Sequence, residues 1–159
     1  MTKEPEGGGR FWQPPFAIGE RFARELMFDE RSVREFAVMA LDPNPLHLDV
    51  DAASRTRFGG LIASGAHSTS WLLGTLGAMV IPRCHSVGLE FDFKLRRAVP
   101  ADRIAIAEWI VTSLEAKASL NGHIMGLAGA LRDPAGEMMV AANGKILLLA
   151  DLDPPKNRG

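Results

Sequence analysis

Asp42 and His47 are the two residues of this sequence best placed to carry out acid–base chemistry together. Pro43 and Pro45 lie between them. A proline cannot occupy a helix interior, and the residue before a proline is driven out of the helical region. We therefore expect residues 42–47 to form a stiff loop that holds a carboxylate close to an imidazole. Such a pair can take a proton from one reacting group and return it to another.

Simpler explanations of the same residues remain open. An aspartate before a turn is commonly a cap, and a histidine in a loop is commonly solvated. A metal site is a further alternative, because Asp49 and Asp51 add two carboxylates close to Asp42 and His47. Turn and cap roles explain these two aspartates better, and we expect Asp51 to cap a short helix over residues 52–54.

Length and composition limit the class of protein. The 159 residues fit one domain over residues 11–150, with polar tails at 1–10 and 151–159. A net charge of −1 gives no indication of a nucleic-acid or anionic-membrane partner. The single cysteine, Cys84, excludes an internal disulfide and fits a reducing compartment, so we expect a cytoplasmic protein. The chain has no apolar run long enough for a membrane span and no apolar signal core.

Two helices are predicted on either side of the Asp42–His47 segment. Asp29 is a good N-cap, and apolar residues recur at helical spacing from Val33 to Leu41. This amphipathic helix would deliver the chain to Asp42. Residues 66–80 are apolar on nearly every side, which predicts a buried helix that ends before Pro82.

The second half of the sequence reads as strands joined by short turns. Four strands are predicted there, at 86–95, 104–111, 118–131 and 137–149, with a turn at 133–136. A further strand is predicted before the helices, at 20–28. In residues 86–95, alternation places five apolar residues on one face: Val87, Leu89, Phe91, Phe93 and Leu95. Early helices followed by strands favour an α+β fold with an antiparallel sheet. A sheet wrapped around one long central helix is the hotdog fold, which we predict here.

Two motifs carry a resemblance to a known family. The stretch FAVMALDPNPLHLDVDAA resembles the hydratase motif of MaoC-like dehydratases, the (R)-specific enoyl-CoA hydratase family, in which an aromatic residue precedes Gly-Asp-x-Asn-Pro-x-His. The following FGGLIASG resembles the FG-x-P-I-A-H-G of that family. The likeness is dense over residues 33–66 and continues, more thinly, to about residue 149.

The resemblance implies a role for each matching residue. Asp42 and His47 fall on the catalytic pair of the family, and Asn44 falls on the asparagine that orders the loop. Gly65 falls at the start of the central helix, where its N–H would meet a thioester carbonyl. A helix N-terminus suits that role, because it presents free N–H groups and a partial positive charge. The resemblance further places Ser64 and Ala63, with Asn44, among the substrate-binding positions.

Three residues differ from the family pattern. Leu41 stands where the family has glycine, at a position where a positive φ is expected, which leucine adopts poorly. Leu61 replaces a proline, and Ser64 replaces a histidine, two changes expected to alter substrate shape. His67 is unexpected on an apolar helix. It either compensates for the histidine missing at position 64 or is a core histidine with a hydrogen-bond partner.

The activity implied by the resemblance is reversible hydration of a trans-2-enoyl thioester to an (R)-3-hydroxyacyl product. No metal or redox cofactor is expected; coenzyme A or an acyl carrier is the handle of the substrate. A hotdog thioesterase and a non-catalytic acyl-binding subunit are the alternatives, and Leu41 favours the second. A homodimer is expected, because pairing covers an exposed sheet edge. Five cations are available for phosphates, although each is better explained as a solvated surface charge: Arg55, Arg57, Lys94, Arg96 and Arg97.

Overall fold

The computed structural model describes residues 11–152, so the predicted tail at 1–10 and most of that at 151–159 lie outside the described residues. The elements in chain order are β1 Arg21–Met27, α1 Glu30–Met39, α2 Pro45–Leu48, α3 Val50–Ser54, β2 Ile62–Ala63, α4 Gly65–Val80, β3 His85–Leu95, β4 Val99–Pro100, β5 Ile104–Lys117, the 3₁₀ turn η1 Ala118–Leu120, β6 Gly122–Arg132 and β7 Met138–Leu149.

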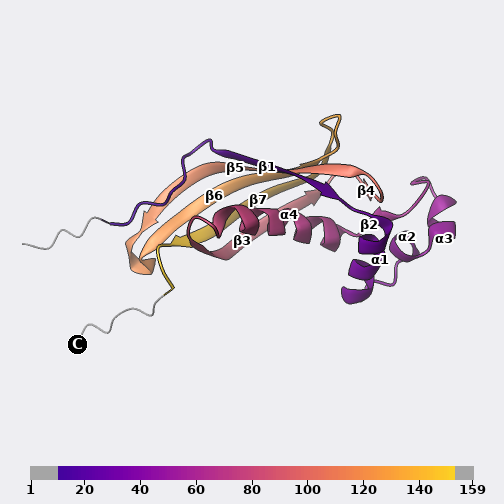
Figure 1. Ribbon diagram of the computed structural model, residues 1–159, viewed down its shortest axis with the longest axis horizontal. Helices are drawn as coiled ribbons and strands as arrows, with labels where there is room; N and C mark the ends of the chain where they lie inside the picture. The colour runs from indigo at the N-terminus through magenta and orange to yellow at the C-terminus, as the bar shows by residue number, and fades with distance from the viewer. Residues whose placement is uncertain (1–10, 153–159) are drawn as a thin grey trace, which may run out of the picture.

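One antiparallel sheet and one long helix dominate the molecule. The five-stranded sheet has the order β1-β5-β6-β7-β3, and β2 pairs with β4 in a separate two-stranded ribbon. The sheet curves over α4, while α1, α2 and α3 gather beyond one end of it (Figure 1). This arrangement confirms the predicted α+β architecture of a sheet around one central helix. Within residues 11–152, no helix combines the length and apolar character needed to cross a membrane.

Helix α4 is held against the sheet by burial and by one buried hydrogen bond. Leu72, Leu76 and Val80 of α4 belong to the core. The fully buried Trp109 of β5 donates its indole N–H to the carbonyl oxygen of Leu72 at 3.0 Å. Gly129 of β6 makes room for this indole, because a Cβ there would lie 2.5 Å from the Trp109 ring. The position of the helix is therefore fixed along its length as well as across the sheet.

The apolar face predicted for β3 is broken by a β-bulge. The register with β7 shifts between Gly88 and Glu90, which leaves Leu89 as the inserted residue. After the bulge, Phe91, Phe93 and Leu95 pair with residues on the core-facing side of β7. Before it, Val87 pairs with Leu147 and points to the opposite face. The prediction of a single five-residue face was wrong, because one inserted residue reverses an alternation of period two.

Three predicted boundaries also need correction. Residues 45–48 form the short helix α2 rather than a loop, because a proline is well tolerated at the first position of a helix. Helix α3 begins after Asp49, whose side chain accepts the N–H of Ala52, so Asp51 is not its cap. The predicted strand 118–131 begins only at Gly122, after η1 and a left-handed Asn121. The turn at 133–136 is confirmed by the hydrogen bond from the Gly136 N–H to the Asp133 carbonyl.

Two glycine-to-alanine substitutions should change stability in opposite directions. Gly129→Ala should lower the free energy of unfolding by about 1–3 kcal/mol, because the new methyl group overlaps the Trp109 ring. Gly74→Ala should raise it by up to about 1 kcal/mol, because this exposed position inside α4 has open space around it. Urea unfolding of both variants measures the two effects. Equal stability of the two variants would contradict the packing described for Trp109.

Candidate active site

Helix α1 ends at Met39, and a tight turn through Ala40 and Leu41 leads the chain into the site. The Asp42 N–H donates to the Ala37 carbonyl at 2.9 Å, and the Leu41 N–H donates to the Val38 carbonyl at 3.1 Å. These two bonds form a Schellman motif, in which the residue after the C-cap adopts a left-handed conformation. Leu41 does so, with φ of 56° and a side chain that is 88% exposed. The positive φ expected at this position is confirmed, and leucine adopts it.

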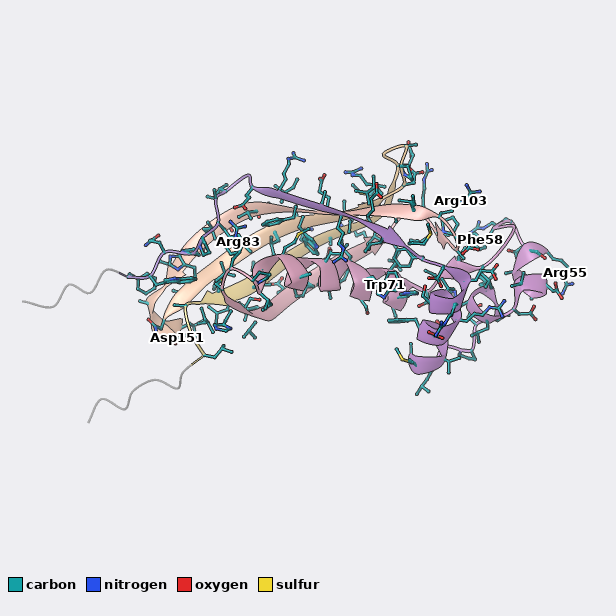
Figure 2. The ribbon with its side chains drawn as sticks, in the orientation of Figure 1. Arg55, Phe58, Trp71, Arg83, Arg103 and Asp151 are labelled. Atoms are coloured by element: carbon teal, nitrogen blue, oxygen red, sulfur yellow. The ribbon has the colours of Figure 1, made fainter. Side chains whose placement is uncertain are left out.

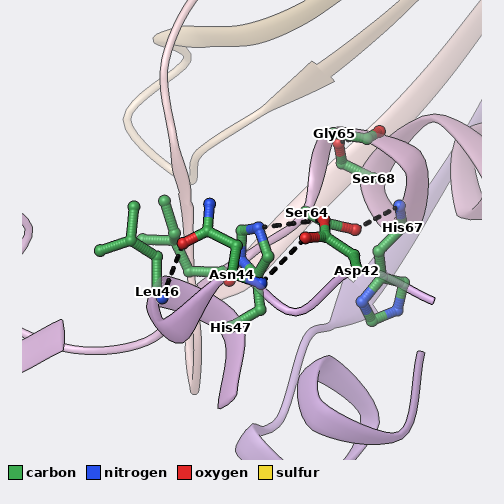
Figure 3. Close-up of polar contacts among 9 residues, drawn as sticks. Asp42, Asn44, Leu46, His47, Ser64, Gly65, His67 and Ser68 are labelled. Atoms are coloured by element: carbon green, nitrogen blue, oxygen red, sulfur yellow. Dashed lines mark hydrogen bonds and ion pairs between the residues drawn. The ribbon is translucent and has the colours of Figure 1, made fainter. Parts of the chain in front are cut away.

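Asp42 and Asn44 order the next segment through their own backbone. The Asn44 N–H donates to Asp42 Oδ1 at 3.1 Å, and the Leu46 N–H donates to Asn44 Oδ1 at 3.0 Å. Asn44 is thereby the N-cap of α2, and Pro45 follows as its first residue. The short helix turns His47 back toward Asp42 (Figure 3). One Asp42 oxygen is used to hold the loop, and the other remains directed at the imidazole.

His47 is buried and its tautomer is set by a backbone carbonyl. Its Nδ1 lies 2.7 Å from the carbonyl oxygen of Ile62 in β2. A carbonyl oxygen only accepts hydrogen bonds, so Nδ1 carries the proton and Nε2 of the neutral ring is an acceptor. Nε2 lies 3.5 Å from Asp42 Oδ2, which is also an acceptor. Asp42 Oδ2 and His47 Nε2 can therefore both accept hydrogen bonds from one bridging donor, or can bond directly to each other if the imidazole gains a second proton.

The N-terminus of α4 supplies hydrogen-bond donors to the same region. Ser64 caps the helix, and its Oγ accepts the His67 N–H at 3.1 Å. The N–H groups of Gly65 and Ala66 make no hydrogen bond within residues 11–152. Gly65 leaves no side chain over this helix end; a Cβ there would lie 2.6 Å from the Leu95 side chain. An oxyanion beside Gly65 would meet free N–H groups and the positive end of the helix dipole.

A cleft of about 540 Å³ brings most of the predicted site together. Asn44, His47, Ala63 and Gly65 all line it. Neither Asp42 nor Ser64 is part of the lining; Asp42 contacts His47, and Ser64 is buried as the cap of α4. The sequence reasoning missed several lining residues: Leu46, Phe58, Ile62, Ser68, Leu95, Ala98 and Val99. Ser68 carries a usable signal, because it follows Gly65 by about one helical turn.

The four potential metal ligands considered from the sequence do not gather. Within residues 11–152, no three His, Cys, Asp or Glu side chains form a group that could hold a metal ion. Asp49 is instead engaged as the N-cap of α3. Asp42 and His47 therefore lie together as a pair and not as part of a larger ligand set.

His67 lies outside this cleft, in an aromatic pocket between α1 and α4. Its ring stacks on Phe36 at a centroid distance of 4.5 Å and meets the edges of Phe28 and Trp71. The ring is fully buried, and neither of its nitrogens has a hydrogen-bond partner among residues 11–152. Burial lowers its pKa to about 4; Asp29 opposes this shift and His47 adds to it. His67 is therefore a core histidine, as one of the two predictions stated, but within residues 11–152 its ring lacks the hydrogen-bond partner expected of such a residue.

Comparison with solved structures defines the class of the fold. The (R)-hydratase from A. caviae involved in PHA biosynthesis is similar over 83% of this chain and 96% of its own, with 26% identity and a TM-score of 0.74. A MaoC-like dehydratase from Rhodospirillum rubrum is similar over 86% and 94%, with 23% identity and a TM-score of 0.73. The HadBC complex from Mycobacterium tuberculosis, a 3R-hydroxyacyl-ACP dehydratase, matches over 82% and 96%, with 16% identity and a TM-score of 0.69. The predicted hotdog fold is confirmed.

A comparison of the sequence with protein families shows to which family the chain belongs. The sequence profile of the MaoC-like domain matches residues 16–112, which is more than half of the chain. The protein therefore belongs to the MaoC-like domain family. A comparison with curated protein sequences gave no significant match.

Replacing Leu41 by glycine should stabilise the protein without disturbing the site. A left-handed conformation costs an L-residue about 1–2 kcal/mol, and glycine escapes this cost at the expense of a more flexible unfolded chain. Because the Leu41 side chain is exposed, little packing is lost. We expect Leu41→Gly to raise the free energy of unfolding by about 0.5–1 kcal/mol. Leu41→Ala is the control, since alanine keeps the strain; equal gains in both variants would show that φ is not the cause.

His67 should make stability depend on pH in a defined window. The unfolded chain binds a proton at His67 near its ordinary pKa of 6.5, whereas the folded chain does so at about 4. The stability contributed by neutral His67 is therefore complete above pH 6.5 and decreases as the pH falls toward 4. Between pH 7.5 and pH 5 the wild type should lose about 2 kcal/mol more than His67→Phe.

Thermal or urea unfolding across this pH range measures that difference. His85→Gln, which removes an exposed histidine of β3, controls for the loss of a histidine as such. Parallel pH profiles for the wild type and His67→Phe would contradict the assignment of His67 as a buried neutral group.

Proposed function

We propose that this protein is a hydro-lyase that adds water reversibly to a trans-2-enoyl thioester and forms an (R)-3-hydroxyacyl thioester. The observation that carries the proposal is the pair of facing acceptor atoms, Asp42 Oδ2 and His47 Nε2, beside the free N–H groups of α4. Membership of the MaoC-like family and the likeness to an (R)-hydratase support it.

The Asp42–His47 pair is suited to bind one water molecule. A separation of 3.5 Å is too long for a strong direct hydrogen bond between the two side chains. A water whose two O–H groups donate to Asp42 Oδ2 and His47 Nε2 would satisfy both acceptors. Its oxygen lone pairs would then point away from the protein, toward a substrate in the cleft. The Ile62 carbonyl keeps the imidazole in the tautomer that this arrangement needs.

In the proposed reaction, the water oxygen attacks C3 of the enoyl group as Asp42 takes one of its protons. The C2=C3 electron pair moves toward the thioester carbonyl, which gains enolate character. The proton held by Asp42 then passes to C2, through His47 or by way of the oxygen now bound to C3, so that Asp42 ends as the carboxylate with which it began. The net change is addition of OH at C3 and H at C2, with no change in oxidation state. No metal or redox cofactor takes part in this proposal.

The N–H of Gly65 is the proposed donor to the developing enolate oxygen. It lies at the first position of a 16-residue helix, where the partial positive charge of the helix is greatest. A donor aimed at charge that appears only in the transition state contributes about 3–4 kcal/mol in other enzymes. The absence of a side chain at Gly65 allows a carbonyl to approach this backbone atom closely.

The proposed assembly is a homodimer formed at the β3 edge of the sheet, which is one of its two edges. Strand β3 pairs only with β7 within the described residues, and its Val87 and Leu89 are each 48% exposed. An unpaired edge with exposed apolar side chains favours pairing with a second copy. Light scattering should give a molar mass close to twice the 17.2 kDa of one chain. A mass of one chain at all concentrations would contradict the dimer.

Substituting Asp42 tests the proposed chemistry. We expect the wild type to remove the enoyl absorbance of crotonyl-CoA, and Asp42→Asn to lower kcat by at least about 100-fold, because the amide cannot accept the proton. Asp51→Asn is the matched control, since this exposed aspartate lies nearby in α3 and its carboxylate makes no described contact.

Two outcomes would contradict the proposal. Equal rates for Asp42→Asn and Asp51→Asn would remove Asp42 from the reaction. Failure of the folded wild type to hydrate crotonyl-CoA and longer or branched enoyl-CoA substrates would favour a non-catalytic acyl-binding role.

A further inference from the structure

Three arginines line the same cleft as His47 and Gly65. Arg57, Arg96 and Arg97 contribute to its wall, and none of the residues between 11 and 152 that line it is an aspartate or glutamate. The chain as a whole is nearly neutral, with 18 basic and 19 acidic residues. The cleft is therefore a local concentration of positive charge, which we call the arginine rim and define as Arg57, Arg96 and Arg97.

The rim is built from two segments that are distant in the sequence. Arg96 and Arg97 follow β3, and both of their backbone N–H groups donate to the carbonyl of Met139, at 2.8 and 3.1 Å. Their backbone is thereby attached to the start of β7. Arg57 comes from the turn after α3, where its guanidinium lies 4.9 Å from the centre of the Phe58 ring. The two segments meet across one cleft, although nothing in their local sequence requires it.

The charges of the rim are available to a ligand. Arg96 makes no ion pair or side-chain hydrogen bond within residues 11–152. Arg97 pairs with Glu137 at 2.9 Å, but both side chains are more than half exposed, and such pairs are worth little. The two other cations considered from the sequence, Arg55 and Lys94, do not line the cleft. Arg55 lies at the outer tip of α3 in Figure 2.

The cleft continues beyond the rim into a second one of about 460 Å³. The two share Phe58, Arg97, Ala98 and Val99, and the second adds one cation and one carboxylate, Arg103 and Asp133. Phe58 and Arg103 lie at the same end of the molecule in Figure 2. A ligand that begins at His47 and Gly65 therefore has a path past the arginine rim toward a fourth arginine.

We propose that the arginine rim binds the phosphate groups of the pantetheine-linked handle that carries the acyl group, with Arg96 as the main contact. This inference rests on the proposed function. Guanidinium groups bind phosphate through paired charge-assisted hydrogen bonds, and an arginine without a partner can form them at little cost. A pantetheine arm separates the thioester from the first phosphate. The phosphate must therefore lie away from the reacting carbon but along the same path.

Variants of neighbouring cations provide matched controls. Arg96→Ala is paired with Lys94→Ala, which lies two residues earlier on β3, and Arg57→Ala is paired with Arg55→Ala. Each variant removes one positive charge, and the two variants of a pair lie in the same segment. Only Arg96 and Arg57 line the cleft, whereas Lys94 and Arg55 do not. General electrostatic effects should therefore be the same within a pair, whereas direct phosphate binding should not.

The decisive comparison uses crotonyl-CoA, crotonyl-pantetheine, which has no phosphate, and a crotonyl-loaded acyl carrier. Arg96→Ala should lower kcat/KM for crotonyl-CoA about tenfold, mainly through KM, and leave crotonyl-pantetheine unchanged. The loss should shrink as ionic strength increases. Loss with crotonyl-CoA alone would assign the rim to the nucleotide phosphates. Loss with the carrier substrate as well would assign it to the phosphate that both handles share.

Other outcomes would overturn the rim as a phosphate site. Equal losses with crotonyl-CoA and crotonyl-pantetheine would indicate a structural effect, and equal losses for Arg96→Ala and Lys94→Ala would indicate net charge alone. Calorimetric titration with coenzyme A separates this inference from the proposed reaction. Weaker binding to Arg96→Ala than to Lys94→Ala would support the rim even if no substrate were hydrated. Equal binding would contradict it even if hydration were observed.

Discussion

The burial of α4 is the constraint on which the rest of the structure depends. Leu72, Leu76 and Val80 lie on the face of α4 that the curved sheet covers, whereas Gly74 of the same helix stays exposed (Figure 1). The bond from the Trp109 indole to the Leu72 carbonyl then fixes the helix along its own axis. Once the helix is fixed, its N-terminus must emerge beside β2 and the segment after α1. The position of the Gly65 N–H is therefore a consequence of core packing.

The segment that carries Asp42 and His47 is held in place by backbone hydrogen bonds rather than by core packing. A Schellman motif at Leu41 turns the chain, and Asn44 restarts it as α2. The Ile62 carbonyl holds His47 in one tautomer, and β2 precedes α4 by a single residue. The acid–base pair and the helix N-terminus are thus connected through two short, hydrogen-bonded segments. This connection explains how a short, partly exposed segment can hold the Asp42 and His47 side chains in a defined geometry.

Much of this arrangement could be predicted from residue types and spacing. Helical periodicity predicted α1, the apolar stretch before Pro82 predicted α4, and the family motifs predicted that Asp42, His47 and Gly65 share one site. The β3 bulge escaped prediction, because one inserted residue leaves no local signal in an alternating sequence. The first turn of α2 was missed because Pro45 was weighed only as a helix breaker. Contacts between distant segments, such as those that form the arginine rim or surround His67, require the tertiary structure.

Analysis of the product formed from crotonyl-CoA in D₂O would test the central claim most directly. The account predicts one 3-hydroxybutyryl-CoA product with the R configuration at C3 and one deuterium at C2, with the thioester bond intact. This result would show that water is added across the double bond on one face of the substrate. Release of free coenzyme A without hydration would place the attack at the thioester carbonyl and contradict the account. Recovery of unchanged crotonyl-CoA from folded protein would contradict it equally.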